Sequence, residues 1–124
     1  MEYFKTLSET DRQRLFEYMR LLDSQADLLE AEHRRLCPKP GEVAVGAAFF
    51  DPWLKAEARR AYILHLRLGK TPDAAEKEAI EWCRLCVRRH NEKSKDVNWA
   101  RCEDSATALV EKLRKDTPAP IKES

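Results

Sequence analysis

Residues 9–36 read ETDRQRLFEYMRLLDSQADLLEAEHRRL, and this stretch decides the fold. Leucine recurs at every seventh residue, and other side chains fall between the leucines at alternating steps of four and three residues. The leucines are Leu15, Leu22, Leu29 and Leu36, and the residues between them are Met19, Ala26 and His33. This spacing places an apolar stripe along one face of a helix. The sequence therefore predicts a helix from about Glu9 to Leu36, roughly 42 Å long.

Proline and glycine separate this helix from the rest of the chain. The stretch CPKPG at 37–41 ends it, because two prolines and a glycine cannot continue a helix. The apolar stretch EVAVGAAFF at 42–50 is extended or a loose turn, so residues 37–51 are expected to form an irregular connection. We expect three further helices, at 52–68 between Asp51 and Gly69 as caps, at 72–90 after Thr71, and at 97–113 after the N-cap Asp96.

Length and composition place these helices in one domain. The chain has 124 residues, of which 36% are charged and 43% hydrophobic, and it contains only 3 glycines. This length fits a single domain of about 100–150 residues, and abundant charge with few glycines is typical of helices with solvated outer faces. The sequence predicts an all-α, compact bundle of about four helices, with a single domain over residues 1–116 and a flexible C-terminal tail over 117–124.

Charge, hydropathy and cysteine content argue against several classes of function. Lys and Arg total 23 against 22 Asp and Glu, a net charge of +1, which argues against a protein that binds polyanions by bulk electrostatics. No apolar run approaches the ~18 residues of a membrane span, and the N-terminal MEYFK lacks the layout of a signal peptide. The 4 cysteines are too few for a secreted disulfide scaffold. We therefore expect a soluble, cytoplasmic protein with no membrane partner.

The first predicted helix carries more apolar surface than one core-facing stripe requires. Tyr18, Leu21 and Leu28 form a second stripe, displaced from the leucine seam by about a quarter to a third of a turn. Either this stripe packs against a second neighbouring helix, or it is exposed and binds a partner protein or a second copy of the chain. The positions that flank the seam hold no opposite-charge pairs of the kind that specify a parallel zipper. We therefore expect the seam to pack within its own bundle, in a monomer or in a homodimer through this helix.

Cysteine and histidine residues form the group in the sequence that most resembles a set of metal ligands. Cys83, Cys86 and His90 share one face of the third predicted helix, and Cys102 lies on the inward stripe of the fourth. Together these four side chains fit a tetrahedral Cys3His zinc site. Free cysteine is also a common small core residue, and this CxxC pair sits in mid-helix, without a turn to wrap the ion. Core packing is the favoured interpretation, so no cofactor is expected and zinc stays an alternative.

The near-neutral total conceals an uneven distribution of charge. Residues 54–95 hold 11 basic and 6 acidic residues, a net charge of +5. A basic face is predicted on the second and third helices, formed by Arg59, Arg60, Arg84, Arg88 and Arg89. Two helices joined by a short turn also fit a helix-turn-helix, but the start of the third helix, PDAAEKE at 72–78, would present carboxylates to phosphates. An acidic protein surface is therefore a better partner for this face than DNA or RNA.

The sequence holds no catalytic signature. Its 3 glycines cannot form a phosphate-binding loop, and it contains neither a G-x-S-x-G elbow nor an H-E-x-x-H motif. The sequence therefore indicates a small non-enzymatic interaction protein, an adaptor or an inhibitor, of which a phage or mobile-element inhibitor of host machinery is one example. It would bind a protein through the Tyr18, Leu21 and Leu28 stripe and the basic face. The alternative is a DNA- or RNA-binding regulator that uses the basic pair of helices.

Overall fold

The longest element of the fold is α1, Glu9–Arg35, the helix that the leucine heptads predict. Ser8 caps it, because the Ser8 Oγ accepts a hydrogen bond from the backbone N–H of Asp11 at 3.1 Å. Carboxylates in its first turn and basic side chains in its last turn both complement the helix dipole. The computed structural model describes residues 2–36, 47–91 and 97–120.

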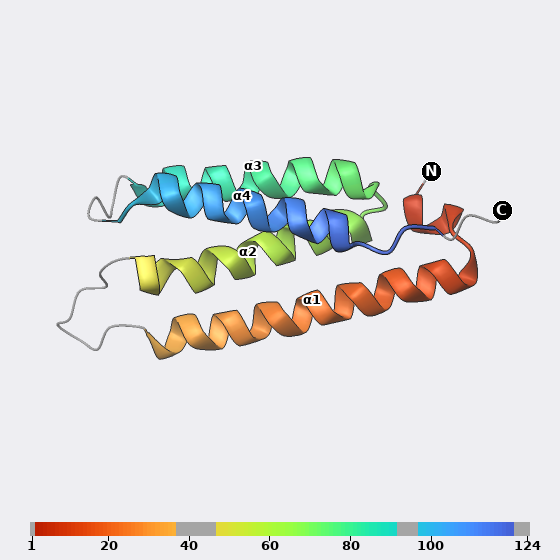
Figure 1. Cartoon of the computed structure of the whole chain (residues 1–124), viewed down its shortest axis with the longest axis horizontal. Helices are drawn as coiled ribbons and strands as arrows, with labels where there is room; N and C mark the ends of the chain where they lie inside the picture. Colours follow the sequence, from red (N-terminus) through yellow and green to blue (C-terminus); the bar gives the residue numbers. More distant parts are fainter. Residues whose placement is uncertain (1, 37–46, 92–96, 121–124) are drawn as a thin grey trace.

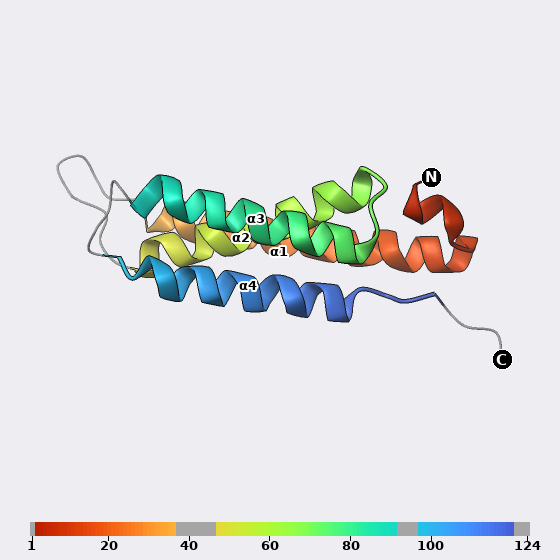
Figure 2. The same ribbon diagram turned by 90° about the horizontal axis from the view of Figure 1, so that it is seen from above.

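The described residues form four α-helices and one short 3₁₀-helix, and they contain no strand. They are η1 (Tyr3–Thr6), α1, α2 (Ala47–Arg67), α3 (Pro72–Asn91) and α4 (Trp99–Asp116). The α-helices lie side by side along the long axis of the molecule, and α2 packs against each of the other three (Figure 1, Figure 2). The predicted all-α bundle of four helices is thus confirmed. Within the described ranges, no helix is long and apolar enough to cross a membrane.

The start of α2 differs from the sequence-based expectation. The prediction that residues 37–51 form an irregular connection is wrong from Ala47 onward, and Asp51 is a helical residue rather than an N-cap. Pro52 lies inside the helix, where it has no N–H to donate to the preceding turn. Alanine's high helix propensity and an ion pair of Asp51 with Lys55, one turn later at 2.8 Å, favour the helix here. Residues 37–46, the rest of the predicted connection, lie outside the described residues.

α4 also begins at a different cap. Asn98 is its N-cap, and the Asn98 Oδ1 accepts a hydrogen bond from the Arg101 N–H at 3.2 Å. The prediction of Asp96 as the cap is therefore wrong, because asparagine two residues later serves the same purpose equally well. Asp96 itself lies outside the described residues. The helix ends at Asp116, beyond the predicted end at Leu113.

The N-terminal part of the leucine seam of α1 faces the core, as predicted. Leu15, Met19, Leu22 and Ala26 are all buried, whereas Leu29, His33 and Leu36 are only partly buried. The largest fully buried side chains of the other helices are Leu54, Tyr62, Ile63, Leu66, Cys83 and Val110. Burial of each large apolar side chain contributes roughly 1.5–3 kcal/mol, so this core is the main source of stability.

A chain of hydroxyl groups fixes the end of α4. The Tyr62 Oη and the Thr117 Oγ1 are 2.5 Å apart, and the Thr117 Oγ1 donates to the Leu113 carbonyl at 2.7 Å. Because the one hydroxyl proton of Thr117 goes to Leu113, Tyr62 is the donor in the first contact. Tyr18 donates to the same carbonyl at 2.9 Å, so two hydroxyls satisfy a carbonyl at the C-terminal end of the helix. Thr117, the first residue of the expected tail, is thereby buried.

The N-terminal segment closes over the turn between α2 and α3. The Tyr3 N–H donates to the Gly69 carbonyl at 2.7 Å. Gly69 has a φ of 92°, in the left-handed region, and it ends α2 as predicted. A Cβ at Gly69 would lie 2.5 Å from the Glu2 Cγ, so glycine is required both by the backbone and by the close approach of the N-terminal segment.

We expect Gly69→Ala to lower the free energy of unfolding by about 1–2 kcal/mol or more, because a side chain in this φ region is strained and would also press on Glu2. Urea denaturation of the full chain measures the change. Gly69→Asn is the matched control and should lose less, since asparagine adopts positive φ more readily than alanine. Equal stability of Gly69→Ala and the wild type would contradict this account of the turn.

We expect stability to fall at alkaline pH through Tyr18 and Tyr62. Burial raises the pKa of both phenols from 10.0 to about 12. Their contribution is fully present below pH 10.0 and is lost as the pH rises through about 12, because the unfolded chain releases these protons first. Urea denaturation over this pH range should give a shallower loss for the Tyr18→Phe/Tyr62→Phe double variant than for the wild type. Ionisation of lysine affects the wild type and the double variant alike. An equal loss of stability with pH in the two proteins would therefore contradict the assignment of this loss to Tyr18 and Tyr62.

Candidate functional site

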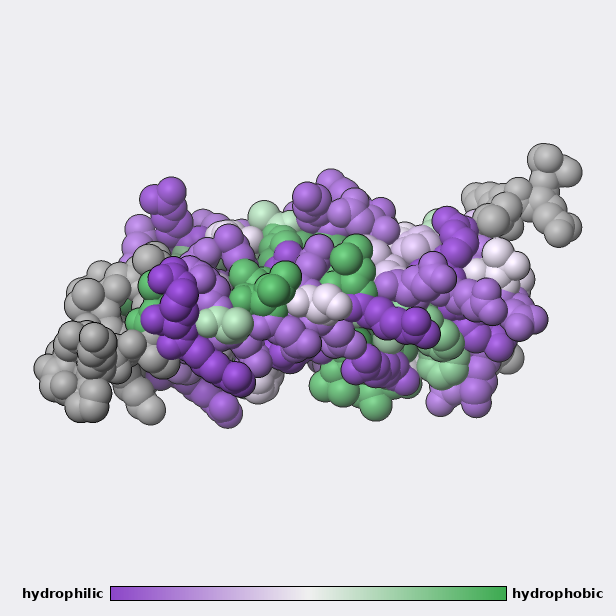
Figure 3. Space-filling model, turned by 90° about the horizontal axis from the view of Figure 1, so that it is seen from below, coloured by the Kyte–Doolittle hydropathy of each residue, from purple (hydrophilic) through white to green (hydrophobic). Residues whose placement is uncertain are grey.

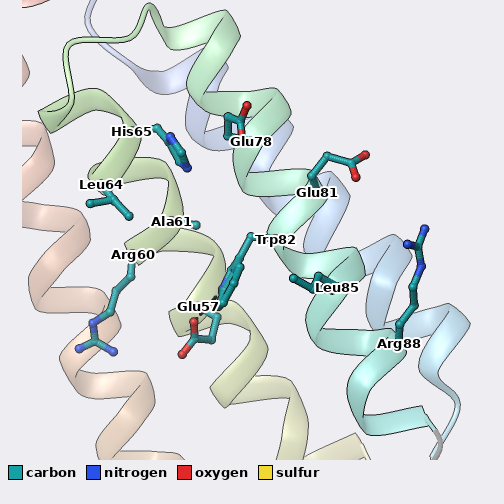
Figure 4. A pocket seen from close by; sticks show the side chains of 10 residues that line it. All are labelled: Glu57, Arg60, Ala61, Leu64, His65, Glu78, Glu81, Trp82, Leu85 and Arg88. Atoms are coloured by element: carbon teal, nitrogen blue, oxygen red, sulfur yellow. Dashed lines mark hydrogen bonds between the residues drawn. The ribbon is translucent and has the colours of Figure 1, made fainter.

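Exposed apolar side chains gather where α2 and α3 lie beside each other. Leu64 on α2 is 53% exposed, and Trp82 and Leu85 on α3 are 38% and 37% exposed. Leu68, at the end of α2, is exposed as well. Leu64, Trp82 and Leu85 border a groove of about 460 Å³ between the two helices (Figure 4). The groove is lined by Glu57, Arg60, Ala61, Leu64, His65, Glu78, Glu81, Trp82, Leu85 and Arg88.

Trp82 is the central side chain of the groove. It extends from α3 toward α2, where the Trp82 Nε1 donates to the Glu57 Oε2 at 2.8 Å (Figure 4). This bond satisfies the indole N–H and orients the ring, which presents a large apolar surface. The buried Ala61 lies opposite on α2, and its small side chain leaves the space that the groove occupies. The groove is thus an apolar surface with an aromatic ring held in a defined direction.

The polar side chains of the groove are mostly engaged with one another or with neighbouring helices. The His65 Nδ1 lies 2.9 Å from the Lys70 Nζ. Burial and the positive charge of Lys70 lower the pKa of His65, so the imidazole is neutral near pH 7 and accepts this hydrogen bond. The Glu81 Oε1 accepts from the Arg84 Nη1 at 2.8 Å. The described lining of the groove holds three glutamates beside His65 and no serine, threonine or cysteine.

The structure divides the second apolar stripe predicted on the first helix. Tyr18 turns inward and bonds the Leu113 carbonyl of α4. Leu21 and Leu28 are 52% and 72% exposed, so two of the three predicted residues lie on the surface. On the face of the molecule seen from below, hydrophobic side chains appear as separate patches among hydrophilic ones (Figure 3). The partner-binding role of these residues stays a prediction.

The predicted basic face is also divided. Arg60 reaches α1, where it pairs with Asp27 at 2.8 Å and with Glu30. Arg84 pairs with Glu81 at 2.8 Å and, on α4, with Glu103 at 3.3 Å. The remaining members of the predicted set are Arg59, which hydrogen-bonds α1, and Arg88 and Arg89, which are exposed at the end of α3. Two of the five arginines are therefore held in ion pairs and two are exposed, and the partner-binding role of the set stays a prediction.

The cysteine and histidine group lies mostly in the core. Cys83, Cys86 and Cys102 are buried as free thiols. His90 packs its ring 4.7 Å from the ring of Trp53, and its Nδ1 lies 2.9 Å from the Cys86 carbonyl. Among the residues that the structure describes, no group of three or more His, Cys, Asp or Glu side chains is arranged to hold a metal ion. The core-packing interpretation fits this burial, and the zinc alternative stays a hypothesis.

The sequence does not reveal the groove, because its apolar residues have the same spacing as core residues. Trp82 and Leu85, for example, are spaced by three residues on α3. A usable signal is the width of the apolar arc on α2, since Leu64 widens it beyond the buried residues.

We expect Cys83, Cys86 and Cys102 to resist alkylation in the folded protein. Burial raises the pKa of Cys83 to about 12 and of Cys86 to about 11, and it also raises the pKa of Cys102. Reaction with iodoacetamide should be at least about a hundredfold slower than in urea, because the thiolate is the nucleophile. Mass spectrometry of the modified peptides assigns each site, and rapid labelling of the folded protein at these three positions would contradict the packing.

Metal analysis of the same protein tests the zinc alternative, because about one equivalent of retained zinc would support the Cys3His site.

Comparisons of this chain with protein-family models, with curated proteins and with solved structures found no match. Its function has therefore to be inferred from its own residues.

Proposed function

We propose that this protein is a non-enzymatic interaction protein, an adaptor or an inhibitor, that binds an α-helix of a partner protein in the groove between α2 and α3. The observation that carries the proposal is the gathering of exposed Leu64, Trp82 and Leu85 around one groove. Contiguous exposed apolar surface of this kind is typical of binding sites.

A helical partner suits the shape and chemistry of this groove. Two neighbouring helices form its walls, and an amphipathic helix commonly binds such a site with anchors at i, i+3 or i+4, and i+7. Trp82 is already oriented by Glu57, so little side-chain freedom is lost on binding. Along α3, Glu78 and Glu81 precede Arg88, and these glutamates already pair with Lys70 at 3.9 Å and with Arg84 at 2.8 Å. A helix with an acidic residue toward Arg88 complements this end of the rim.

The charge distribution supports a protein partner over the nucleic-acid alternative. Of the predicted basic residues, Arg60 and Arg84 are neutralised by carboxylates of the same chain. Glu78 and Glu81, on the exposed side of α3, pair with Lys70 at 3.9 Å and with Arg84 at 2.8 Å, so this part of α3 offers phosphates no excess of positive charge. DNA- or RNA-binding stays the alternative hypothesis, with Arg88 and Arg89 as its remaining exposed cations.

The Leu64→Glu/Leu85→Glu double variant tests the groove. Both side chains are exposed, so we expect an unchanged melting temperature, and we expect the variant to lose the proteins that the tagged wild type retains from cells of the native host. Leu28→Glu is the matched control, because it places the same charge on an exposed leucine of α1, and it should keep the groove partner. Photo-crosslinking from position 85 then identifies the bound segment, which should be helical.

Retention of the same proteins by the wild type and by the groove variant would overturn the proposal. So would a crosslink to nucleic acid in place of a protein, which would favour the alternative. Capture of no partner at all by the wild type would also count against an interaction protein.

A further inference from the structure

Arg59 differs from the other arginines of α2 because it forms no ion pair within the part of the chain that the structure describes. Its Nε donates to the Gln25 Oε1 of α1 at 3.2 Å, and its Nη1 donates to the Lys55 carbonyl at 3.3 Å. Among the described residues, no carboxylate lies within 4.0 Å of this guanidinium. The adjacent Arg60, in contrast, pairs with both Asp27 and Glu30. Arg59 is therefore a cation that this bundle hydrogen-bonds but does not neutralise.

The guanidinium of Arg59 is partly buried and still accessible. The Arg59 side chain is partly exposed, and its partial burial lowers the pKa of the guanidinium. Its Nη2 makes no hydrogen bond within the described part of the chain, where every buried side-chain nitrogen has a partner. The Nη2 is therefore open to solvent. A half-desolvated guanidinium with a free N–H edge is well suited to a carboxylate, which accepts charge-assisted hydrogen bonds in this geometry.

Apolar side chains flank this cation on α1. Gln25, the residue that Arg59 contacts, lies between Leu21 and Leu28, which are both exposed. The two leucines are seven residues apart, or roughly 10 Å along the helix, and lie on the same side of it. Interfaces often combine such apolar contacts with a central arginine.

We propose that Leu21, Leu28 and Arg59 form a second binding site, for a partner helix that carries one carboxylate between two apolar side chains seven residues apart. The apolar side chains contact the two leucines, and the carboxylate pairs with the Arg59 guanidinium. This site shares no residue with the α2–α3 groove. It therefore goes beyond the function proposed above, and its test is independent of the test of the groove.

A polyanion fits this surface less well than a helix with a single carboxylate. Glu17, four residues before Leu21, is exposed, and Glu32, four residues after Leu28, is partly exposed and pairs with Arg35 at 2.6 Å. Arg35 neutralises Glu32, whereas a run of phosphates or a strongly acidic segment would meet repulsion from Glu17 beyond Leu21. Recognition at this site depends on a single carboxylate placed beside the Arg59 guanidinium. DNA and anionic membranes therefore serve as competing outcomes in the test.

The test measures binding of a synthetic helical peptide about three heptads long to the full chain, by fluorescence anisotropy. The peptide has leucines seven residues apart with one glutamate between them, and its partner peptide has glutamine in place of that glutamate. We expect the glutamate peptide to bind about tenfold more tightly, equivalent to about 1.4 kcal/mol, and Arg59→Gln to remove this difference. Together the four combinations form a double-mutant cycle that isolates the contact of Arg59 with the carboxylate.

Matched variants separate this contact from effects on folding. Arg20→Gln removes another exposed arginine of α1 and should not change binding, and Leu85→Gln in the groove should not change it either. Leu28→Gln, at a largely exposed position, should weaken binding of both peptides without changing the melting temperature. Arg59→Lys retains the charge and should retain part of the preference for glutamate, which guards against a folding defect in Arg59→Gln.

Equal affinity for the two peptides, or an unchanged preference in Arg59→Gln, would overturn the proposal. So would the absence of any binding by either peptide. Stronger binding of duplex DNA or of vesicles with anionic lipid, lost in Arg59→Gln, would assign the site to a polyanion and would also overturn it.

Discussion

Burial of α2 on three sides is the constraint on which the rest of the structure depends. α1, α3 and α4 all pack against it, and Leu54, Tyr62 and Ile63 are fully buried. Each such side chain contributes roughly 1.5–3 kcal/mol, whereas an exposed ion pair contributes about 0–1 kcal/mol. The apolar core therefore sets the position of α2, and the charged residues adapt to it. One edge of α2 stays exposed at Leu64, and Leu68 is exposed just after the helix ends.

This arrangement brings basic residues of α2 beside acidic residues of α1. Residues 54–95 carry a net charge of +5, and residues 1–36, with 6 basic and 8 acidic residues, carry −2. These charges meet across the contact of α1 with α2, where Arg60 pairs with Asp27 at 2.8 Å and Arg67 pairs with Asp23 at 2.6 Å. Arg60 and Arg67 thus connect two neighbouring helices, whereas Arg88 and Arg89 are exposed at the end of α3.

The fold could be predicted from the sequence because its signals are local. The leucine heptads and Gly69 each act within one or two turns of a helix, and both lie where the sequence predicts them. The sequence does not predict the early start of α2, because Asp51 and Pro52 also fit an N-cap followed by a first-turn proline, although a helix can hold proline further in when the chain before it favours a helix. The groove was missed because exposure depends on how far each helix is rotated in the bundle. A spacing of three or four residues indicates which side chains share a face of a helix, but it does not indicate whether a neighbouring helix covers that face.

Two adjacent arginines show how the same interface is neutralised on one side and open on the other. Arg59 and Arg60 point about 100° apart on α2, and they meet different sides of α1. Arg60 finds carboxylates there, whereas Arg59 finds the amide of Gln25. An amide oxygen accepts a hydrogen bond but carries no charge, so it orients the guanidinium without neutralising it. The helix that organises the bundle therefore presents an apolar edge toward α3 and an unneutralised cation toward α1. Surfaces of these two kinds select partners by different chemistry, the first by the apolar area buried and the second by the position of a single carboxylate.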